Sequence, residues 1–368
     1  MKMYDNKLVE ILQNESYMGS AYGTQVEIKP IPDDDTQGVI DARVLARIME
    51  LMSRQQESAL PNEDSIRNMR DSTGAPNLNL NTVEMLTRYI EVHVEDRKIP
   101  VWIYYPRRPI GQKKRPACIF LHGGSWIAGS PFVVENPMRL LAEKAGCVVF
   151  NVDYSLAPEH RFPAALDDAY GVLRHIFENP DEYGIDPKKI GIGGDSAGGN
   201  VAAATVLKDR DLGTHMIGRQ ILIYPVVTAV NTGIRGFEWS LDEYEMSEEQ
   251  RPMLEPGLIL GRPMKKGEEV IQNSLIKYVN TEDEFSDPYV SPMLAESFQG
   301  ICKTMIMVAE FDGLRLQGEY FGKLLRDNGV ETRIIRYKGM GHAFLDHLGY
   351  YPQTEDVILE MAKEIASI

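Results

Sequence analysis

The pattern of hydrophobic and polar positions divides the chain after residue 85 into strand-like and helix-like segments. Residues 89–94 and 99–104 alternate apolar and polar side chains around a polar turn, which predicts a β-hairpin. Continuous apolar runs, typical of strands buried on both faces, follow at 117–121, 147–152, 189–193, 220–224, 305–309 and 332–335. Amphipathic stretches typical of helices occur at 138–144, 164–178, 318–328 and 355–365. This alternation predicts an α/β fold with a mostly parallel central sheet flanked by helices.

Two regions do not follow this alternation. Residues 1–85 contain no clear strand, and the Asp-Asp-Thr sequence at 34–36 is expected to cap a helix over 39–52. Residues 228–284 form a long insertion, and connections of this length inside a compact domain are often lids. We therefore expect a catalytic domain made of residues 86–227 and 285–368. The N-terminal helical segment 1–85 and the insertion 228–284 would together form its helical cap.

Composition and charge restrict the classes of partner and the compartment. The chain has 368 residues, 43% of them hydrophobic, and a net charge of −15, so we expect no nucleic-acid partner. It contains neither an N-terminal apolar signal segment nor a run of 18 uncharged apolar residues. We expect a cytoplasmic protein without integral membrane association. The cysteines Cys118, Cys147 and Cys302 have no paired spacing, so we expect neither a metal site nor a redox motif.

A candidate nucleophile lies in a glycine-flanked turn. Residues 194–198 read Gly-Asp-Ser-Ala-Gly and lie between the apolar run 189–193 and a helix-like segment that begins near Asn200. A strand, a tight turn and a helix in this order lift the serine hydroxyl above the sheet at a helix N-terminus. The context therefore predicts that Ser196 is a catalytic nucleophile.

A serine hydroxyl needs a base, and the base needs an orienting carboxylate. His342 lies in a glycine-rich loop after the last predicted strand, downstream of Ser196 and of the candidate acids, as the order Ser–acid–His requires. Asp312 lies in the loop after strand 305–309, whereas Glu310 still belongs to the end of that strand. We predict the triad Ser196, Asp312 and His342. Asp312 is also expected to cap the helix that begins near Leu314.

An oxyanion needs fixed N–H donors, and a second glycine-rich turn is suited to provide them. Residues 121–126 read Leu-His-Gly-Gly-Ser-Trp and follow the first predicted parallel strand, where esterases carry their oxyanion motif. Glycines there let backbone amides approach a ligand closely. We predict an oxyanion hole made by the amides of Gly123, Gly124 and Ala197.

Together these motifs resemble the hormone-sensitive-lipase-like branch of the α/β-hydrolases over residues 85–365. The resemblance rests on residues 122–126, 153–160, 193–200 and 287–292, on Asp312 and on residues 342–344. It implies the α/β-hydrolase fold, hydrolysis of carboxylic esters without a cofactor or metal, and a helical cap. It also implies architectural roles for His122 and for residues 154–160, and it is compatible with a homodimer through the last strand and helix.

Three positions depart from the family pattern. Ser125 replaces a third glycine, Ser155 replaces the arginine of the Tyr-x-Leu-Ala-Pro-Glu motif, and Gly313 replaces the proline after the acid. None of these removes a triad residue. We expect them to change the shape of the pocket rather than the chemistry.

The leading hypothesis is a serine carboxylesterase that hydrolyses short- to medium-chain esters through an acyl-enzyme on Ser196. One alternative is an amidase or peptidase with the same triad, in which an acidic side chain binds a substrate amine; the candidates are Glu159, Asp242, Glu243 and Glu245. Another alternative is a non-catalytic receptor for a small molecule. Receptors on this framework lack the histidine, so the presence of His342 favours an enzyme.

Overall fold

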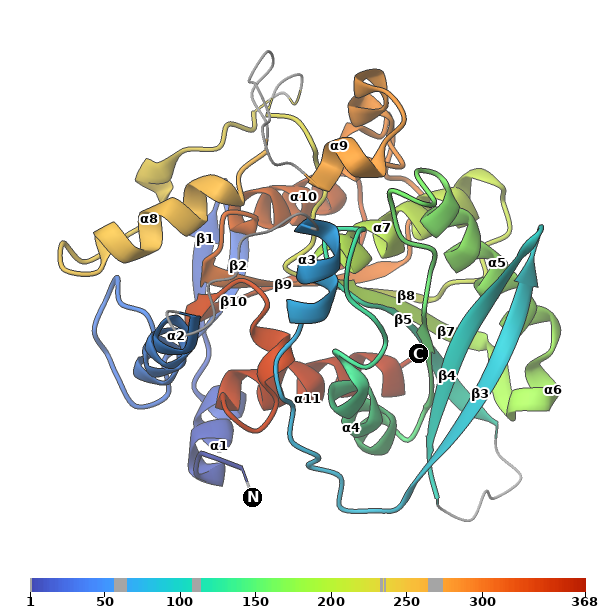
Figure 1. The fold of residues 1–368 in the computed structure, drawn as a ribbon, viewed down its shortest axis with the longest axis horizontal. Helices are drawn as coiled ribbons and strands as arrows, with labels where there is room; N and C mark the ends of the chain where they lie inside the picture. The colour runs from blue at the N-terminus through green and yellow to red at the C-terminus, as the bar shows by residue number, and fades with distance from the viewer. Residues whose placement is uncertain (1, 56–64, 108–113, 232–233, 235, 264–273) are drawn as a thin grey trace.

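The fold is built around one twisted sheet. The computed structural model describes residues 2–55, 65–107, 114–231, 234, 236–263 and 274–368. These residues form a ten-stranded sheet in the order β1-β2-β10-β9-β8-β7-β5-β6-β4-β3 (Figure 1). The strands are β1 Tyr17–Ala21, β2 Thr24–Lys29, β3 Met85–Val94, β4 Arg97–Pro106, β5 Arg115–Leu121, β6 Val148–Val152, β7 Ile185–Asp195, β8 Arg219–Ile223, β9 Lys303–Phe311 and β10 Thr332–Gly341.

The pairing of the strands confirms the predicted, mostly parallel sheet. Neighbouring strands from β2 to β6 in this order are parallel, whereas β1, β4 and β3 each run antiparallel to their neighbours at the two edges. Every residue of β6 and β8 is buried, as their continuous apolar sequences predict for strands covered on both faces. The hairpin β3–β4 also forms as predicted, with its turn at Glu95, where φ is positive.

Helices cover both faces of this sheet. In Figure 1, α4 and α11 lie on one side of the sheet, and α7 and α10 lie on the other. The helices are α1 Asn6–Asn14, α2 Ala42–Gln55, α3 Ser65–Ser72, α4 Glu135–Ala145, α5 Ala164–Glu178, α6 Pro180–Tyr183, α7 Ser196–Asp211, α8 Arg251–Leu260, α9 Ser274–Tyr278, α10 Arg315–Asp327 and α11 Pro352–Ala366, with short 3₁₀ turns η1 Leu241–Glu243, η2 Glu282–Ser286, η3 Pro292–Leu294 and η4 Phe344–His347. Among the described residues, every helix is too short or too polar to cross a bilayer.

The N-terminal segment contributes strands as well as helices, so the prediction of no strand in residues 1–85 was wrong. β1 and β2 form an antiparallel hairpin, and β2 pairs in parallel with β10. The side chain of Lys29 at the end of β2 is only 1% exposed, and its Nζ lies 3.2 Å from Glu360 and 3.4 Å from Asp356 on α11. These buried ion pairs join the hairpin to α11.

This hairpin also changes the expectation for a dimer. The last strand, β10, is hydrogen bonded to β9 on one side and to β2 on the other. A second copy could pair with β10 only by displacing β2, because each strand edge offers one row of N–H and C=O groups. The edge that the family resemblance implied for a homodimer is therefore occupied within the chain.

Helix α2 begins later than the Asp-Asp-Thr sequence at 34–36 predicts. Gly38 adopts a φ of 69°, which a continuing right-handed helix does not allow. The side chain of Asp41 then accepts a hydrogen bond of 2.8 Å from the N–H of Arg43, the interaction of an N-cap residue. The predicted helix exists, but Asp41 starts it.

Candidate active site

Ser196 lies at the sharp junction between β7 and α7. Its φ of 53° is in the left-handed region, which costs free energy in a residue with a side chain. The flanking glycines are required by the close packing of this turn. A Cβ on Gly194 would lie 2.4 Å from the backbone of Gly198, and a Cβ on Gly198 would lie 2.1 Å from the carbonyl oxygen of Leu121. The strand–turn–helix context predicted from sequence is therefore present.

The three predicted triad residues meet at this end of the sheet. The Oγ of Ser196 lies 3.0 Å from Nε2 of His342, and Nδ1 of His342 lies 2.7 Å from Oδ2 of Asp312. The side chain of Asp312 is 2% exposed, whereas that of His342 is 40% exposed. The carboxylate is thus shielded from water while the imidazole stays accessible to a substrate.

Asp312 and Glu310 have different partners, as their positions around the end of β9 predicted. The second carboxylate oxygen of Asp312 accepts a hydrogen bond of 2.9 Å from the N–H of Leu314. The prediction that Asp312 caps the following helix was wrong, because α10 begins at Arg315 with Leu314 as its N-cap and without a side-chain cap. Glu310 instead accepts a hydrogen bond of 2.8 Å from the N–H of Gly339. Glu310 therefore supports β10, and Asp312 is the carboxylate beside the imidazole.

The electrostatic surroundings favour a charged His342. Burial by itself lowers the pKa of His342, but the negative charge and the hydrogen bond of Asp312 outweigh that effect, so the pKa is raised above its ordinary value. The more distant carboxyl groups of Asp195 and Asp346 act in the same direction. This environment stabilises the imidazolium that forms when His342 accepts a proton.

The glycine-rich turn after β5 corrects one predicted oxyanion donor. The N–H of Gly123 donates a hydrogen bond of 2.8 Å to Oδ1 of Asp195, so this N–H is already engaged. In the described part of the chain, the N–H groups of Gly124, Ser125 and Ala197 donate to no acceptor. The structure therefore does not support the predicted role of Gly123 as an oxyanion donor, because the side chain of Asp195 uses its amide. The N–H groups of Gly124 and Ala197 remain available to donate to an oxyanion, as the prediction required.

Asp195, the residue before the nucleophile, holds this turn in position. Burial raises the pKa of Asp195 to about 6, although the hydrogen bond from Gly123 opposes that change. The turn itself requires glycine, because Gly124 has a φ of 129° and a Cβ there would lie 2.1 Å from the carbonyl oxygen of Ala128. The departure at Ser125 is tolerated with a φ of 56°, in the left-handed region.

Most motif residues around this turn are buried, and they make structural contacts. The ring of His122 is fully buried and stacks on the ring of Tyr154 with centroids 4.5 Å apart. The Tyr154 hydroxyl donates a hydrogen bond of 2.7 Å to the carbonyl oxygen of His122. Trp126 donates through Nε1 to Oδ1 of Asn200 at 3.2 Å, which ties the turn to α7. Ser155, which replaces the family's arginine, donates its backbone N–H to Asp168 at 2.9 Å.

Sequence reasoning missed two residues of the insertion that hold the acid loop. The Tyr244 hydroxyl donates a hydrogen bond of 2.8 Å to the carbonyl oxygen of Asp312, and Trp239 Nε1 donates one of 2.9 Å to the carbonyl oxygen of Gly313. Both aromatic residues are buried. A Cβ at Gly313 would lie 2.4 Å from the carbonyl oxygen of Leu258 on α8, which explains why a proline does not fit there. No local signal in the sequence identifies these long-range contacts.

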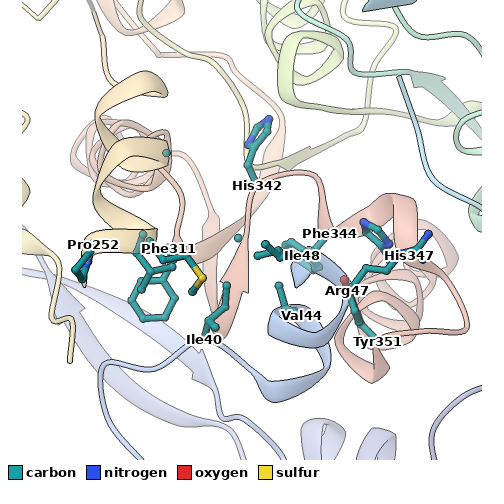
Figure 2. A pocket seen from close by; sticks show the side chains of 14 residues that line it. Ile40, Val44, Arg47, Ile48, Pro252, Phe311, His342, Phe344, His347 and Tyr351 are labelled. Carbon is teal, nitrogen blue, oxygen red and sulfur yellow. The ribbon is translucent and has the colours of Figure 1, made fainter. Parts of the chain in front are cut away.

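A cavity opens beside His342. Its volume is about 690 Å³, and α2 of the N-terminal segment and α8 of the insertion both contribute to its wall (Figure 2). Most of the lining side chains are apolar, among them Ile40, Val44 and Leu254. The described residues contain no group of three or more His, Cys, Asp or Glu side chains arranged to hold a metal ion.

The acidic residues of the amine-binding alternative do not lie at this cavity. Both carboxylate oxygens of Glu159 pair with the guanidinium of Arg70, at 2.9 and 2.7 Å, and this hydrogen bonding lowers the pKa of Glu159 to about 2. Asp242, Glu243 and Glu245 are exposed to solvent and lie outside the cavity as the described residues define it.

Comparison with known proteins agrees with this geometry. A family model described as the alpha/beta hydrolase fold matches residues 118–346. The chain belongs to the α/β-hydrolase family. This hydrolase is 32% identical over 279 residues to an arylesterase of Saccharolobus solfataricus, with 76% of this chain and 83% of the relative covered. It is 31% identical over 267 residues to carboxylesterase NlhH of Mycobacterium tuberculosis, with 70% and 76% covered.

Solved structures give the same result for the hydrolase over most of its length. An arylesterase structure superposes with a TM-score of 0.72 at 26% identity, covering 89% of this hydrolase and 99% of that chain. A hyperthermophilic esterase from the archaeon Pyrobaculum calidifontis superposes with a TM-score of 0.70 at 27% identity, covering 89% and 98%. The predicted α/β-hydrolase fold and the resemblance to the hormone-sensitive-lipase-like branch are confirmed.

Proposed function

We infer that this protein is a carboxylesterase, an enzyme that hydrolyses carboxylic esters through an acyl-enzyme on Ser196. The observation that carries this inference is the continuous hydrogen-bonded series Ser196–His342–Asp312, with distances of 3.0 and 2.7 Å. The relationship to named arylesterases and carboxylesterases supports an ester as the substrate class.

The geometry supports a two-step mechanism. Ser196 Oγ attacks the ester carbonyl while His342 Nε2 accepts the hydroxyl proton and then donates it to the leaving alcohol. Asp312, buried and bonded to Nδ1, holds the imidazole in the required tautomer and stabilises its charged form. Water activated by the neutral His342 then hydrolyses the acyl-enzyme, so one ester and one water become one acid and one alcohol.

We assign the oxyanion hole to the amides of Gly124, Ser125 and Ala197. Their N–H groups donate to no acceptor in the described residues, and Ala197 directly follows the nucleophile at the N-terminus of α7. An N–H that already donates to a carboxylate, as that of Gly123 does, cannot stabilise a developing alkoxide equally well. Removal of one such donor typically lowers kcat by about 10²–10³-fold.

We propose that α2 and α8 belong to a cap that limits the substrate. Both helices line the cavity beside His342. This cavity has a volume of about 690 Å³ and a mostly apolar wall, which suits short to medium acyl or alcohol groups. A small-molecule ester is therefore the proposed substrate.

The central experiment measures covalent labelling and hydrolysis together. The purified protein is treated with a fluorescent organophosphonate ester, and the modified peptide is mapped; we expect one adduct, on Ser196. Ser196→Ala and His342→Ala should each lower kcat on an aryl ester by about four to six orders of magnitude, and the double variant should lose little more. His93→Gln, an exposed histidine on β3, is the matched control.

Matched substrates separate the ester hypothesis from its alternatives. An aryl ester and the anilide of the same acid should differ strongly in kcat/KM, with the ester preferred. A higher rate on the anilide would favour an amidase. An unlabelled Ser196 together with no ester hydrolysis would favour a receptor and would contradict the proposed function.

A further inference from the structure

The cavity beside His342 is apolar along most of its wall but ends in a group of hydrogen-bond donors. Phe344 and its apolar neighbours lie next to His342, and the side chains of Arg47, His347 and Tyr351 gather beyond them (Figure 2). Arg47 comes from α2, His347 ends η4, and Tyr351 is the N-cap residue directly before α11. Two segments far apart in the chain therefore build this polar end.

Arg47 has an unused hydrogen-bonding edge. Its side chain is 12% exposed, and its Nη1 donates a hydrogen bond of 2.6 Å to Glu50, which is 43% exposed. Its guanidinium lies over the ring of Tyr350, 5.6 Å from the centroid. Its Nε is buried and has no acceptor in the described part of the chain. The edge formed by Nε and Nη2 is the edge that binds a carboxylate through two parallel hydrogen bonds.

His347 and Tyr351 add two neutral donors beside this edge. Nδ1 of His347 is buried and has no partner among the described residues, and its ring lies 4.7 Å from the ring of Tyr351. Burial, together with the positive charge of Arg47, lowers the pKa of His347 to about 4, so His347 is neutral at pH 7 and can donate through one ring nitrogen. The hydroxyl of Tyr351, a residue only 3% exposed, donates to no described atom.

A permanently charged guanidinium and two neutral donors match an anionic acceptor with two oxygens. Carboxylates are bound in this way, and the described wall of the cavity contains no aspartate or glutamate that would repel one. We propose that the preferred substrates are esters with a free carboxylate at the far end of one chain, which pairs with Arg47 while the ester carbonyl lies at Ser196. This proposal rests on the carboxylesterase function and names its substrate class.

The reaction remains the one proposed above. Water adds across the ester bond, so a hemiester of a dicarboxylic acid gives the dicarboxylate and an alcohol, and the carboxylate at the far end does not react. Two chemical sources share this recognition: the carboxylate can lie on the acyl side, as in a dicarboxylic hemiester, or on the alcohol side, as in an acetylated hydroxy acid.

The first test uses the unmodified enzyme and substrates of equal chain length. Methyl hemiesters of a series of dicarboxylic acids, the corresponding methyl alkanoates and the corresponding amino-acid methyl esters are compared by proton release. We expect kcat/KM for the best carboxylate-terminated ester to exceed that of the ammonium-terminated ester at least tenfold. Acetyl esters of ω-hydroxy acids form the second arm and report whether the carboxylate belongs on the alcohol side. The proposal would be overturned if the methyl esters with carboxylate, methyl and ammonium ends were hydrolysed at equal rates and the acetyl esters showed no preference for a carboxylate end either.

The second test uses variants. Arg47→Met should abolish the preference for the carboxylate-terminated ester over the neutral ester, and Arg47→Lys should keep part of that preference. Arg67→Met is the matched control, because it removes the same charge from a side chain on α3 that is 77% exposed. An equal loss of preference in Arg47→Met and Arg67→Met would contradict a direct contact.

A binding measurement makes this test independent of turnover. In the Ser196→Ala background, calorimetry with an intact hemiester should give binding that Arg47→Met weakens at least tenfold. Binding with this dependence but no turnover in the wild type would retain the anion site and contradict the esterase function. Turnover of neutral esters that depends on Ser196, without any effect of Arg47, would retain the esterase and overturn the anion site.

Discussion

The hydroxyl of Tyr244 donates a hydrogen bond of 2.8 Å to the backbone carbonyl of Asp312, the residue whose carboxylate bonds to His342. Tyr244 belongs to the insertion between β8 and β9, and its ring also packs against the guanidinium of Arg315, 4.4 Å away. The insertion therefore does more than line the cavity. It also fixes the backbone of Asp312, the predicted acid of the triad.

This contact predicts a loss of catalytic activity in the variant Tyr244→Phe. The variant keeps the ring but removes the hydrogen-bond donor to a buried carbonyl. Leaving such a group without its partner typically lowers the free energy of unfolding by about 1–3 kcal/mol. Because the carbonyl of Asp312 also accepts from the N–H of Arg315 at 2.9 Å, we expect the lower part of that range. We expect kcat on an aryl ester to fall about tenfold or less, with KM nearly unchanged. Tyr170→Phe, whose hydroxyl contacts Thr214 at the surface, is the control. A fall in Tm with full kcat would mean that the contact serves stability only.

The raised pKa of His342 predicts the acid limb of the pH profile. His342 acts as a base only when it is neutral, so kcat/KM should fall as the pH decreases through the pKa of the free enzyme. Because the charge and the hydrogen bond of Asp312 raise that pKa, the midpoint of the fall should lie at a higher pH than for an ordinary histidine. Asp312→Asn should lower kcat by about 10⁴-fold and move the remaining acid limb to lower pH. An acid limb that keeps its midpoint in Asp312→Asn would indicate that another group controls it.

Two glycines with positive φ should respond differently to substitution by alanine: Gly124 in the turn after β5, and Gly146 at the end of α4. Gly124→Ala introduces a Cβ 2.1 Å from the carbonyl oxygen of Ala128, so the turn must shift and the N–H donors with it. We expect kcat to fall by at least about 10²-fold. Gly146→Ala is the matched control, since Gly146 has a φ of 63° but no atom within 4 Å of its added Cβ. It should cost about 1–2 kcal/mol of stability and leave kcat unchanged. Equal kcat values for the two variants would contradict the assigned oxyanion hole.

The buried ion pairs of Lys29 predict how much the N-terminal hairpin depends on them. Lys29→Met leaves the buried carboxylates of Asp356 and Glu360 with one cation fewer, and loss of one partner of a buried pair typically costs about 3–5 kcal/mol. We expect the lower value, because Arg333 also contacts Glu360. The measurement is the denaturant midpoint of unfolding. Lys363→Met removes another partner of Glu360, but its side chain is 56% exposed, so the expected cost is below about 1 kcal/mol. Similar midpoints for the two variants would contradict the prediction that the buried ion pairs of Lys29 stabilise the fold more than an exposed pair does.

Some features that sequence analysis missed had a local signal. Residues 25–29 alternate polar and apolar side chains, which is a local signal for a strand, and Val26 and Ile28 are buried in the structure. Tyr22 and Gly23 before this strand both have positive φ in the structure. Two adjacent residues with positive φ are typical of a tight hairpin turn. The preceding strand, Tyr17–Ala21, is short and mostly exposed, which is why the hairpin as a whole gave a weak pattern.

The sequence by itself determined the order of the central strands and helices and the α/β-hydrolase fold. It also predicted Ser196, His342 and Asp312 as a triad, and these side chains form one hydrogen-bonded series in the structure. Burial on both faces of a strand and the tight turn around a nucleophile each impose residue types on a short, continuous stretch, so one stretch is enough to recognise them. Only the tertiary structure decided that Asp195 uses the amide of Gly123, that Tyr244 holds Asp312 and that β2 covers β10. Each of these is a hydrogen bond between segments that are distant in the chain, and its existence depends on which surfaces the folded chain brings together.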